Sequence, residues 1–201
     1  MTYIPTIVGI GGTAAAGSST EQAVEHVLAI ARLLGCRTQL IGSEQMLALP
    51  HYGAAPEALP EAARALVKAV RAADGLVIAS PGYHGSVSGL VKNALDYIEE
   101  TAKDQRVYLD GLPVGLIATA YGGQASVNTL HTLRTITHAL RGWPTPLGVA
   151  INSSTRPFQN GKCVDEVTER QLAMLGQQIV QFAIQRAASV TNAPGDLASI
   201  G

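Results

Sequence analysis

Residues 75–98 read GLVIASPGYHGSVSGLVKNALDYI and contain, in order, a strand, a turn and a helix. The apolar, β-branched run 75–79 is typical of a buried strand. Glycine, proline and serine then mark a turn at 80–89. After Ser86, steps of three and one place six apolar residues on one side of a helix, with Lys92 and Asp96 on another side as a possible ion pair. The six are Val87, Leu90, Val91, Ala94, Leu95 and Ile98.

The same alternation of strand and helix runs along the whole chain. Short apolar runs predict five strands, at 6–10, 37–41, 75–79, 114–119 and 147–151. Helical spacing predicts four further helices, near 18–34, 60–73, 123–141 and 163–187. This alternation is typical of a doubly wound α/β domain, whose apolar strands form a parallel sheet covered by helices on both faces.

The length of 201 residues favours one domain, which we place at residues 1–187, with 188–201 as a loose C-terminal tail. Right-handed crossovers bring all strand-to-helix turns to the carboxyl edge of the sheet, where ligands bind in such folds. The function is therefore expected in three turns, 11–20, 80–89 and 119–124.

Charge and cysteine content exclude several classes of function. Fourteen basic and 15 acidic residues give a net charge of -1, and no basic patch indicates nucleic acid or a membrane as partner. Only 14% of residues are charged, against about 25% in ordinary globular proteins, which favours a surface partly covered by another subunit. Cys36 and Cys163 stand apart without a CxxC motif, so no disulfide framework or metal site is expected. The N-terminus lacks a basic targeting region, which favours the cytoplasm.

The first turn has the composition of a phosphate site. Its glycines let backbone N–H groups approach an anion, and the next helix adds its positive N-terminus. Four hydroxyl side chains lie beside them, those of Thr13, Ser18, Ser19 and Thr20. The turn has no Gly-Lys-Ser/Thr motif, which excludes a nucleoside-triphosphate P-loop. The alternatives are a plain Ser/Thr helix cap and a dinucleotide loop, since residues 9–14 fit GxGxxG/A loosely.

The second turn suits a flat ring with polar edges. Pro81 and Gly82 bend the chain away from the sheet, and Tyr83 offers an apolar face. Gly85 and Ser86 can present backbone N–H groups to ring heteroatoms.

Residues 81–96, PGYHGSVSGLVKNALD, resemble the P-x-Y-x-G-S-x-x-G-x-L-K-N-A-L-D signature of the NADPH-dependent FMN reductases, with Val91 at the usual leucine position. The resemblance extends over roughly residues 5–187 and includes the segments 49–52, 109–114 and 119–123. It implies a flavodoxin-like fold whose five strands, numbered along the chain, lie in the order 2-1-3-4-5. Relatives often have an arginine in the first turn, where this chain has alanine at 14–16.

The resemblance also implies the cofactor and the residues that hold it. FMN would lie across the carboxyl ends of the first, third and fourth strands. Its phosphate would meet Gly12, Thr13, Ser18, Ser19 and Thr20. Its ring would contact Pro81, Gly82, Tyr83, His84, Gly85 and Ser86, and its pyrimidine side would border Thr119, Ala120, Tyr121, Gly122 and Gly123.

The implied reaction is hydride transfer from NADPH, or NADH, to flavin N5, followed by transfer to an acceptor in the same space. Such ping-pong chemistry needs no acid or base from a side chain. A helix starting at Gly122 would point its N–H groups at the N1–O2 edge of the ring. His84 is the one candidate catalytic residue, as a donor to a quinone; the alternative is a loop histidine with one backbone hydrogen bond.

Other functions stay open at this point. An FMN-bound quinone or azo reductase shares the first half-reaction, and a flavodoxin-type electron carrier would be more acidic than this chain. A dehydrogenase using residues 9–11 would leave the second turn unexplained. The family resemblance further implies a homodimer or homotetramer and, for one subgroup, a flavin-dependent monooxygenase as partner.

Four other places could contribute to a site or an interface. The long connection 43–60, with His51 and Tyr52, is expected to form a wall of the cleft. Arg156 and Lys162 could meet the NADPH 2′-phosphate or be solvated loop charges. Trp143 is expected in the core or an interface, and His131 and His138 at the surface or a subunit contact.

Overall fold

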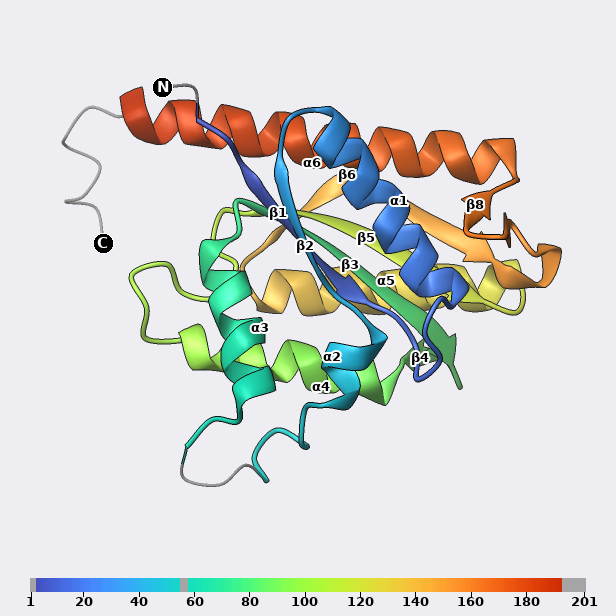
Figure 1. Ribbon diagram of the computed structural model, residues 1–201, viewed down its shortest axis with the longest axis horizontal. Coiled ribbons are helices and arrows are strands. Elements are labelled where there is room, and N and C mark those ends of the chain that lie inside the picture. Colours follow the sequence, from blue (N-terminus) through green and yellow to red (C-terminus); the bar gives the residue numbers. More distant parts are fainter. Residues whose placement is uncertain (1–2, 55–57, 193–201) are drawn as a thin grey trace.

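Five long strands form a parallel sheet between two layers of helices (Figure 1). The computed structural model describes residues 3–54 and 58–192. The strands lie in the order β2-β1-β3-β5-β6, and each neighbouring pair is parallel. This order confirms the predicted 2-1-3-4-5 topology. The bounds are β1 (Thr6–Gly11), β2 (Arg37–Ile41), β3 (Gly75–Tyr83), β5 (Pro113–Ala120) and β6 (Trp143–Asn152).

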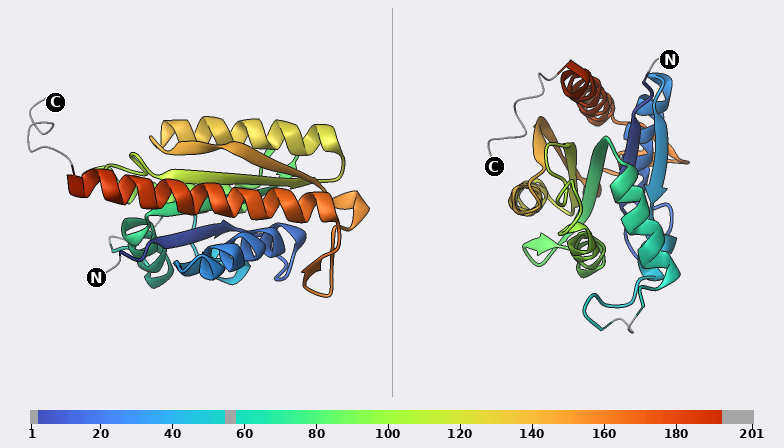
Figure 2. Two further views of the ribbon diagram at one scale, coloured as in Figure 1. Left: turned by 90° about the horizontal axis from the view of Figure 1, so that it is seen from above. Right: turned by 90° about the vertical axis from the view of Figure 1, so that its left-hand side faces the viewer.

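The helices divide between the two faces of the sheet (Figure 2). On one face lie α1 (Ser19–Leu33) and α6 (Glu166–Asn192). The other face carries α3 (Glu61–Ala72), α4 (Gly89–Asp96) and α5 (Gly123–Ala139). A short helix, α2 (Ser43–Leu47), follows β2, and a 3-10 helix, η1 (Tyr97–Thr101), continues α4.

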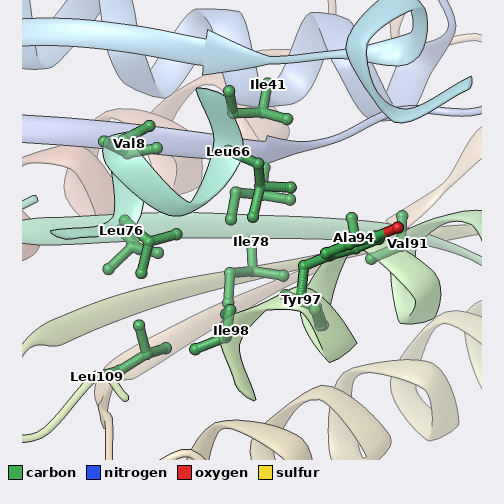
Figure 3. Close-up of a cluster of buried hydrophobic side chains, with 14 of the residues drawn as sticks. Val8, Ile41, Leu66, Leu76, Ile78, Val91, Ala94, Tyr97, Ile98 and Leu109 are labelled. Atoms are coloured by element: carbon green, nitrogen blue, oxygen red, sulfur yellow. The ribbon is translucent and has the colours of Figure 1, made fainter. Parts of the chain in front are cut away.

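Each face of the sheet has its own hydrophobic core, because successive strand residues point to opposite sides. Ile7 packs toward α1 and α6, whereas the next residue, Val8, packs toward α3 and α4. Figure 3 shows the core on the side of α3 and α4, which contains Leu66, Leu76 and Ile98. On the side of α1 and α6, two strand positions require glycine because the helices lie so close to the sheet. A Cβ on Gly9 would lie 2.4 Å from Val24 Cγ1, and a Cβ on Gly115 would lie 2.4 Å from Ile179 Cδ1.

The helix predicted after Ser86 begins later than its apolar spacing indicates. Ser86 and Val87 form a short antiparallel strand, β4 (Ser86–Val87), that pairs with Gly82 and Tyr83 at the end of β3. The helix starts at Gly89, because Ser88 caps it by accepting the Val91 N–H at 3.2 Å. The inclusion of Val87 in the helix is therefore wrong. Lys92 and Asp96 form the expected i,i+4 ion pair.

The C-terminal helix is longer than predicted. It runs to Asn192, so residues 188–192, which were expected in a loose tail, are helical. No glycine or proline interrupts the chain between Gly176 and Asn192, which removes the usual reason for a helix to end. The rest of the predicted tail, 193–201, lies outside the described residues.

Two connections contain structure that periodicity did not predict. The segment 43–60 opens with α2, and β6 is followed by a 3-10 turn, η2 (Ser153–Thr155), and a small hairpin. The hairpin strands are β7 (Phe158–Gln159) and β8 (Lys162–Cys163). These elements are too short to show a hydrophobic period.

Membrane-spanning helices, metal-ligand clusters and the two cysteines can be compared with the expectations from composition. In the ranges 3–54 and 58–192, no helix has both the length and the apolar character needed to cross a membrane. Within the same ranges, no three His, Cys, Asp or Glu residues gather as metal ligands. Cys36 and Cys163 are free thiols, and burial raises the pKa of each.

Candidate active site at the carboxyl edge of the sheet

The three turns selected from the sequence lie side by side at the carboxyl edge of the sheet. Gly11 at the end of β1 pairs with Ala79 of β3, and Pro81 of β3 pairs with Thr119 of β5. In Figure 1 this is the end of the sheet where β4 lies and α1 begins. The strand order therefore places the turn after β3 between the other two.

The first turn presents unpaired backbone donors. Among the described residues, the N–H groups of Ser18, Ser19 and Thr20 have no hydrogen-bond partner, since they lie in the cap and first turn of α1. Their side chains differ in access. Ser18 and Ser19 are half-buried, whereas Thr20 is buried and its Oγ1 lies 2.6 Å from Thr119 Oγ1. Such a helix N-terminus binds anions.

The remaining predicted residues of the first turn shape the loop. Thr13 Oγ1 accepts the Ala15 N–H at 3.1 Å, so this hydroxyl stabilises the loop itself. Gly12 is buried with a φ of 153°, and a Cβ there would lie 2.8 Å from Ser43 Oγ. Gly12 is therefore close to the start of α2.

Glu21, which directly follows the first turn and lies at the start of α1, is a residue that sequence analysis missed. Its Oε2 accepts the Gly17 N–H at 3.0 Å and the Ser43 hydroxyl at 2.6 Å. The Ser18-x-x-Glu21 spacing of a capping box could have identified it.

The second turn is a β-hairpin with a two-residue loop. His84 and Gly85 connect β3 to β4 with φ angles of 50° and 86°, the positive pair that a type I′ turn requires. Gly85 faces open space, and Tyr83 is 53% exposed. The His84 side chain is exposed and has no hydrogen bond among the described residues, so the backbone bond considered above is not formed.

The base of this hairpin is buried. The Ser80 hydroxyl accepts the Ser88 N–H at 2.9 Å and joins the start of the turn to its end. A Cβ on Gly82 would lie 2.3 Å from Thr129 Oγ1, so only glycine lets β3 approach α5 here. Pro81 is buried, and Pro81 and Gly82 therefore support the hairpin from below.

The third turn is held by a hydrogen bond from Asn152, at the end of the neighbouring strand β6. Thr119 and Ala120 are buried, whereas Tyr121 is 84% exposed. The Gly122 N–H, which was expected to face a ring, instead donates to Asn152 Oδ1 at 2.9 Å. That oxygen also accepts the Ser154 N–H and hydroxyl. Asn152 ends β6 at the same edge of the sheet, and its position there is the signal that sequence analysis overlooked.

A groove of about 400 Å³ joins the second turn to the third. Gly122 and Gly123, like Gly85, have open space where a side chain would begin. No lining residue is charged, and no Lys or Arg occurs in the segments 9–20, 80–89 and 119–125. Its lining consists of Gly85, Tyr121, Gly122, Gly123, Gln124, Ala125 and Asn128. This edge of the sheet thus combines an uncharged groove with unpaired N–H donors at the start of α1.

Several other predicted residues lie away from this groove. The Tyr52 N–H donates to Asn93 Oδ1 at 2.8 Å and its ring packs edge-on against Tyr97, which fixes the loop against α4. Burial and the nearby Glu100 raise the pKa of Tyr52. Neither Tyr52 nor His51 lines the groove, and Arg156 and Lys162 are exposed.

Trp143 lies at the opposite edge of the sheet, where β6 begins. It is 59% exposed and packs against Phe182, with 5.6 Å between ring centroids. His131 and His138 are exposed on α5, which confirms the expected surface position.

Solved structures with the same arrangement are flavodoxin-like. FerB from Paracoccus denitrificans, a flavoenzyme NAD(P)H:(acceptor) oxidoreductase, superposes with a TM-score of 0.72 at 18% identity, over 90% of this chain and 98% of that one. A flavodoxin, WrbA-like protein from Agrobacterium tumefaciens gives a TM-score of 0.60 at 19% identity, over 90% and 98%. The fold is therefore flavodoxin-like.

Sequence comparison narrows this class to one family. The profile of NADPH-dependent FMN reductases matches residues 5–156, and the chain belongs to this family. The FMN-dependent NADPH-azoreductase of Staphylococcus haemolyticus is 44% identical over 85 residues, which are 42% of this chain and 42% of that relative. The NADPH azoreductase of Bacillus sp. (strain OY1-2) is 38% identical over 73 residues, 36% and 38% of the two chains. The matched stretches thus span less than half of these relatives.

Proposed function

We propose that this protein is an FMN-dependent NADPH oxidoreductase. The observation that carries the proposal is the position of three unpaired N–H groups, those of Ser18, Ser19 and Thr20, on the sheet edge that also holds the uncharged groove. A phosphate suits the first feature, and a planar ring suits the second. FMN has both parts in one molecule.

In this proposal each turn has a separate role. The N–H groups and hydroxyls at the start of α1 hold the phosphate. The hairpin at His84 and Gly85 and the turn at Tyr121–Gly123 hold the ring between them, where glycines leave room for it. Pro81, Thr119 and Ala120 are buried and Gly82 is half-buried, and these four residues keep the turns in place.

FMN supplies the redox chemistry, by taking a hydride from NADPH and passing two electrons to an acceptor. The side chains then need only bind and orient the reactants. Tyr121, and to a lesser degree Tyr83, expose aromatic faces against which a nicotinamide can stack. An acceptor would use the same space after NADP⁺ leaves, which gives ping-pong kinetics.

For the acceptor, we propose a flat aromatic compound such as an azo dye or a quinone. Two of the matched relatives are named NADPH azoreductases, and the exposed Tyr121 ring suits stacking on a planar molecule. Free FMN is the second candidate, because the matching family is that of the FMN reductases. Steady-state assays with an azo dye, a quinone and free FMN separate these activities.

The test begins with protein reconstituted with FMN and mixed anaerobically with NADPH. We expect the visible absorption of the flavin to bleach much faster than in a mixture of FMN and NADPH without protein. No bleaching would contradict the proposal and favour a flavodoxin-type electron carrier. Asn128→Trp should abolish flavin binding by filling the groove. Thr135→Trp, on the same helix but away from the groove, should not.

We further propose a homodimer, in which α4 and α5 face the partner, and a cytoplasmic location, where NADPH is supplied. The low charge content and the exposed Val127 on α5 support a covered surface. Sedimentation of a single 20.9 kDa species at micromolar concentration would contradict the dimer.

A further inference from the structure

Glu21 places a carboxylate beside the anion donors of the first turn. It occupies the third position of α1, and its Oε2 accepts the Gly17 N–H at 3.0 Å, one residue before the unpaired N–H of Ser18. Ser43 adds its hydroxyl at 2.6 Å to the same oxygen and its N–H at 3.4 Å to Oε1. The carboxylate is thus held beside the place proposed for the phosphate.

Among the described residues, no cation forms an ion pair with Glu21. No Lys or Arg precedes Arg32 in the sequence. Arg32 itself is bound to Glu25 at 3.1 Å. The positive end of α1 attracts anions, and Glu21 already provides one there.

Helix capping accounts for the position of Glu21 but does not require its charge. A glutamine has a carbonyl oxygen that can accept the Gly17 N–H in the same way. The negative charge is therefore a separate property of the site, and its main effect falls on any second anion that enters.

Building on the proposed function, we infer that Glu21 is a specificity-determining residue that weakens the contribution of the phosphate to flavin binding. The flavin is then held chiefly through its ring, in the groove between the second and third turns. It follows that riboflavin binds about as well as FMN.

The test measures the dissociation constants of FMN and riboflavin by calorimetry, for the wild type, Glu21→Gln and Glu61→Gln. For the wild type, we expect the two constants to agree within about threefold. Glu21→Gln should bind FMN about tenfold more tightly and riboflavin unchanged, because a unit charge lies close to the phosphate near the protein surface. Glu61→Gln, which changes an exposed glutamate in the first turn of α3, is the matched control and should change neither constant.

Other outcomes overturn the inference. A wild type that prefers FMN over riboflavin by about a hundredfold contradicts it without any variant, so a Glu21→Gln protein that fails to fold does not block the test. Weaker or unchanged FMN binding by a folded Glu21→Gln, with its thermal midpoint checked by circular dichroism, also contradicts it. In both cases flavin binding by the wild type leaves the proposed function intact. Binding of neither flavin overturns the proposed function together with this inference.

Discussion

The side-chain oxygens of Thr20 and Thr119 lie 2.6 Å apart, and both residues are buried. Thr20 is the second residue of α1, the helix that follows β1, and Thr119 lies near the end of β5. The bond therefore passes over β3, which separates these two strands. It joins the anion donors of the first turn to the groove at the third turn. The position of the N–H donors of α1 relative to the groove is therefore fixed from within the core.

Removing both of these hydroxyls should destabilise the protein by less than the sum of the two single losses. Thr20→Val or Thr119→Val leaves a buried hydroxyl without a partner, at a cost of about 1–3 kcal/mol in the free energy of unfolding. The double variant replaces both polar groups and should cost less than the sum of the single changes. A double-mutant cycle by urea denaturation measures this, and simple additivity would show that the bond is unimportant.

Gly85 should resist substitution because of its backbone conformation. Its φ of 86° makes Gly85→Ala unfavourable by about 1–2 kcal/mol, and flavin binding should weaken as the hairpin distorts. Gly89 serves as a control, since it has an ordinary φ, open space for a Cβ and a place in the first turn of α4. Gly89→Ala should keep both stability and binding, and equal losses in the two variants would refute the argument.

Asn152 should act as a positioning residue for the third turn. Asn152→Ala removes the acceptor that the Gly122 N–H shares with the Ser154 groups, while the Gly122 N–H keeps its second acceptor, the Ala120 carbonyl at 3.0 Å. We therefore expect a loss of about 1 kcal/mol in stability. Weaker flavin binding should accompany it, because Gly122 lines the groove. Asn152→Asp keeps an acceptor oxygen and should restore most of the binding. If Asn152→Asp binds flavin as poorly as Asn152→Ala, the acceptor role is wrong.

Tyr121 should affect substrate binding without affecting stability. Its side chain is 84% exposed, so Tyr121→Ala should leave the thermal midpoint unchanged. The loss of stacking, worth about 0.5–1.5 kcal/mol, should raise the KM of an aromatic acceptor between twofold and tenfold. Tyr121→Phe keeps the ring and should match the wild type. An unchanged KM for Tyr121→Ala would remove Tyr121 from the acceptor site.

Stability should fall at alkaline pH through Tyr3. Burial and the hydrogen bond to Asp74 raise the pKa of Tyr3 to about 12, above its ordinary value of 10.0. The folded state therefore retains a proton that the unfolded state loses first. The stabilisation is complete below pH 10 and disappears as the pH rises toward 12. Because Tyr3 is 53% exposed, solvent screens part of the effect. Tyr3→Phe should flatten this part of the profile of unfolding free energy against pH, and an unchanged profile would contradict the assignment.

Local patterns predicted most of the secondary structure correctly. Strand and helix periods depend on neighbouring residues, so the five strands and most helices could be located before the structure was known. Val87 shows the limit of this method. Val87 lies three residues before Leu90, which is the spacing expected within a helix. Only its pairing with Gly82 shows that Val87 belongs to the hairpin and not to α4. The end of α6 was misplaced because no breaker residue marks it.

From its residues alone, the chain specified a doubly wound sheet and three glycine-rich turns, because side-chain period and backbone freedom are local properties. The network within the site came from folding. Glu21 meets Ser43, Gly122 meets Asn152, and Thr20 meets Thr119 across 22, 30 and 99 residues of sequence. Such contacts follow from parallel register and crossover connections, which bring distant strand ends to one edge, and no local pattern encodes them.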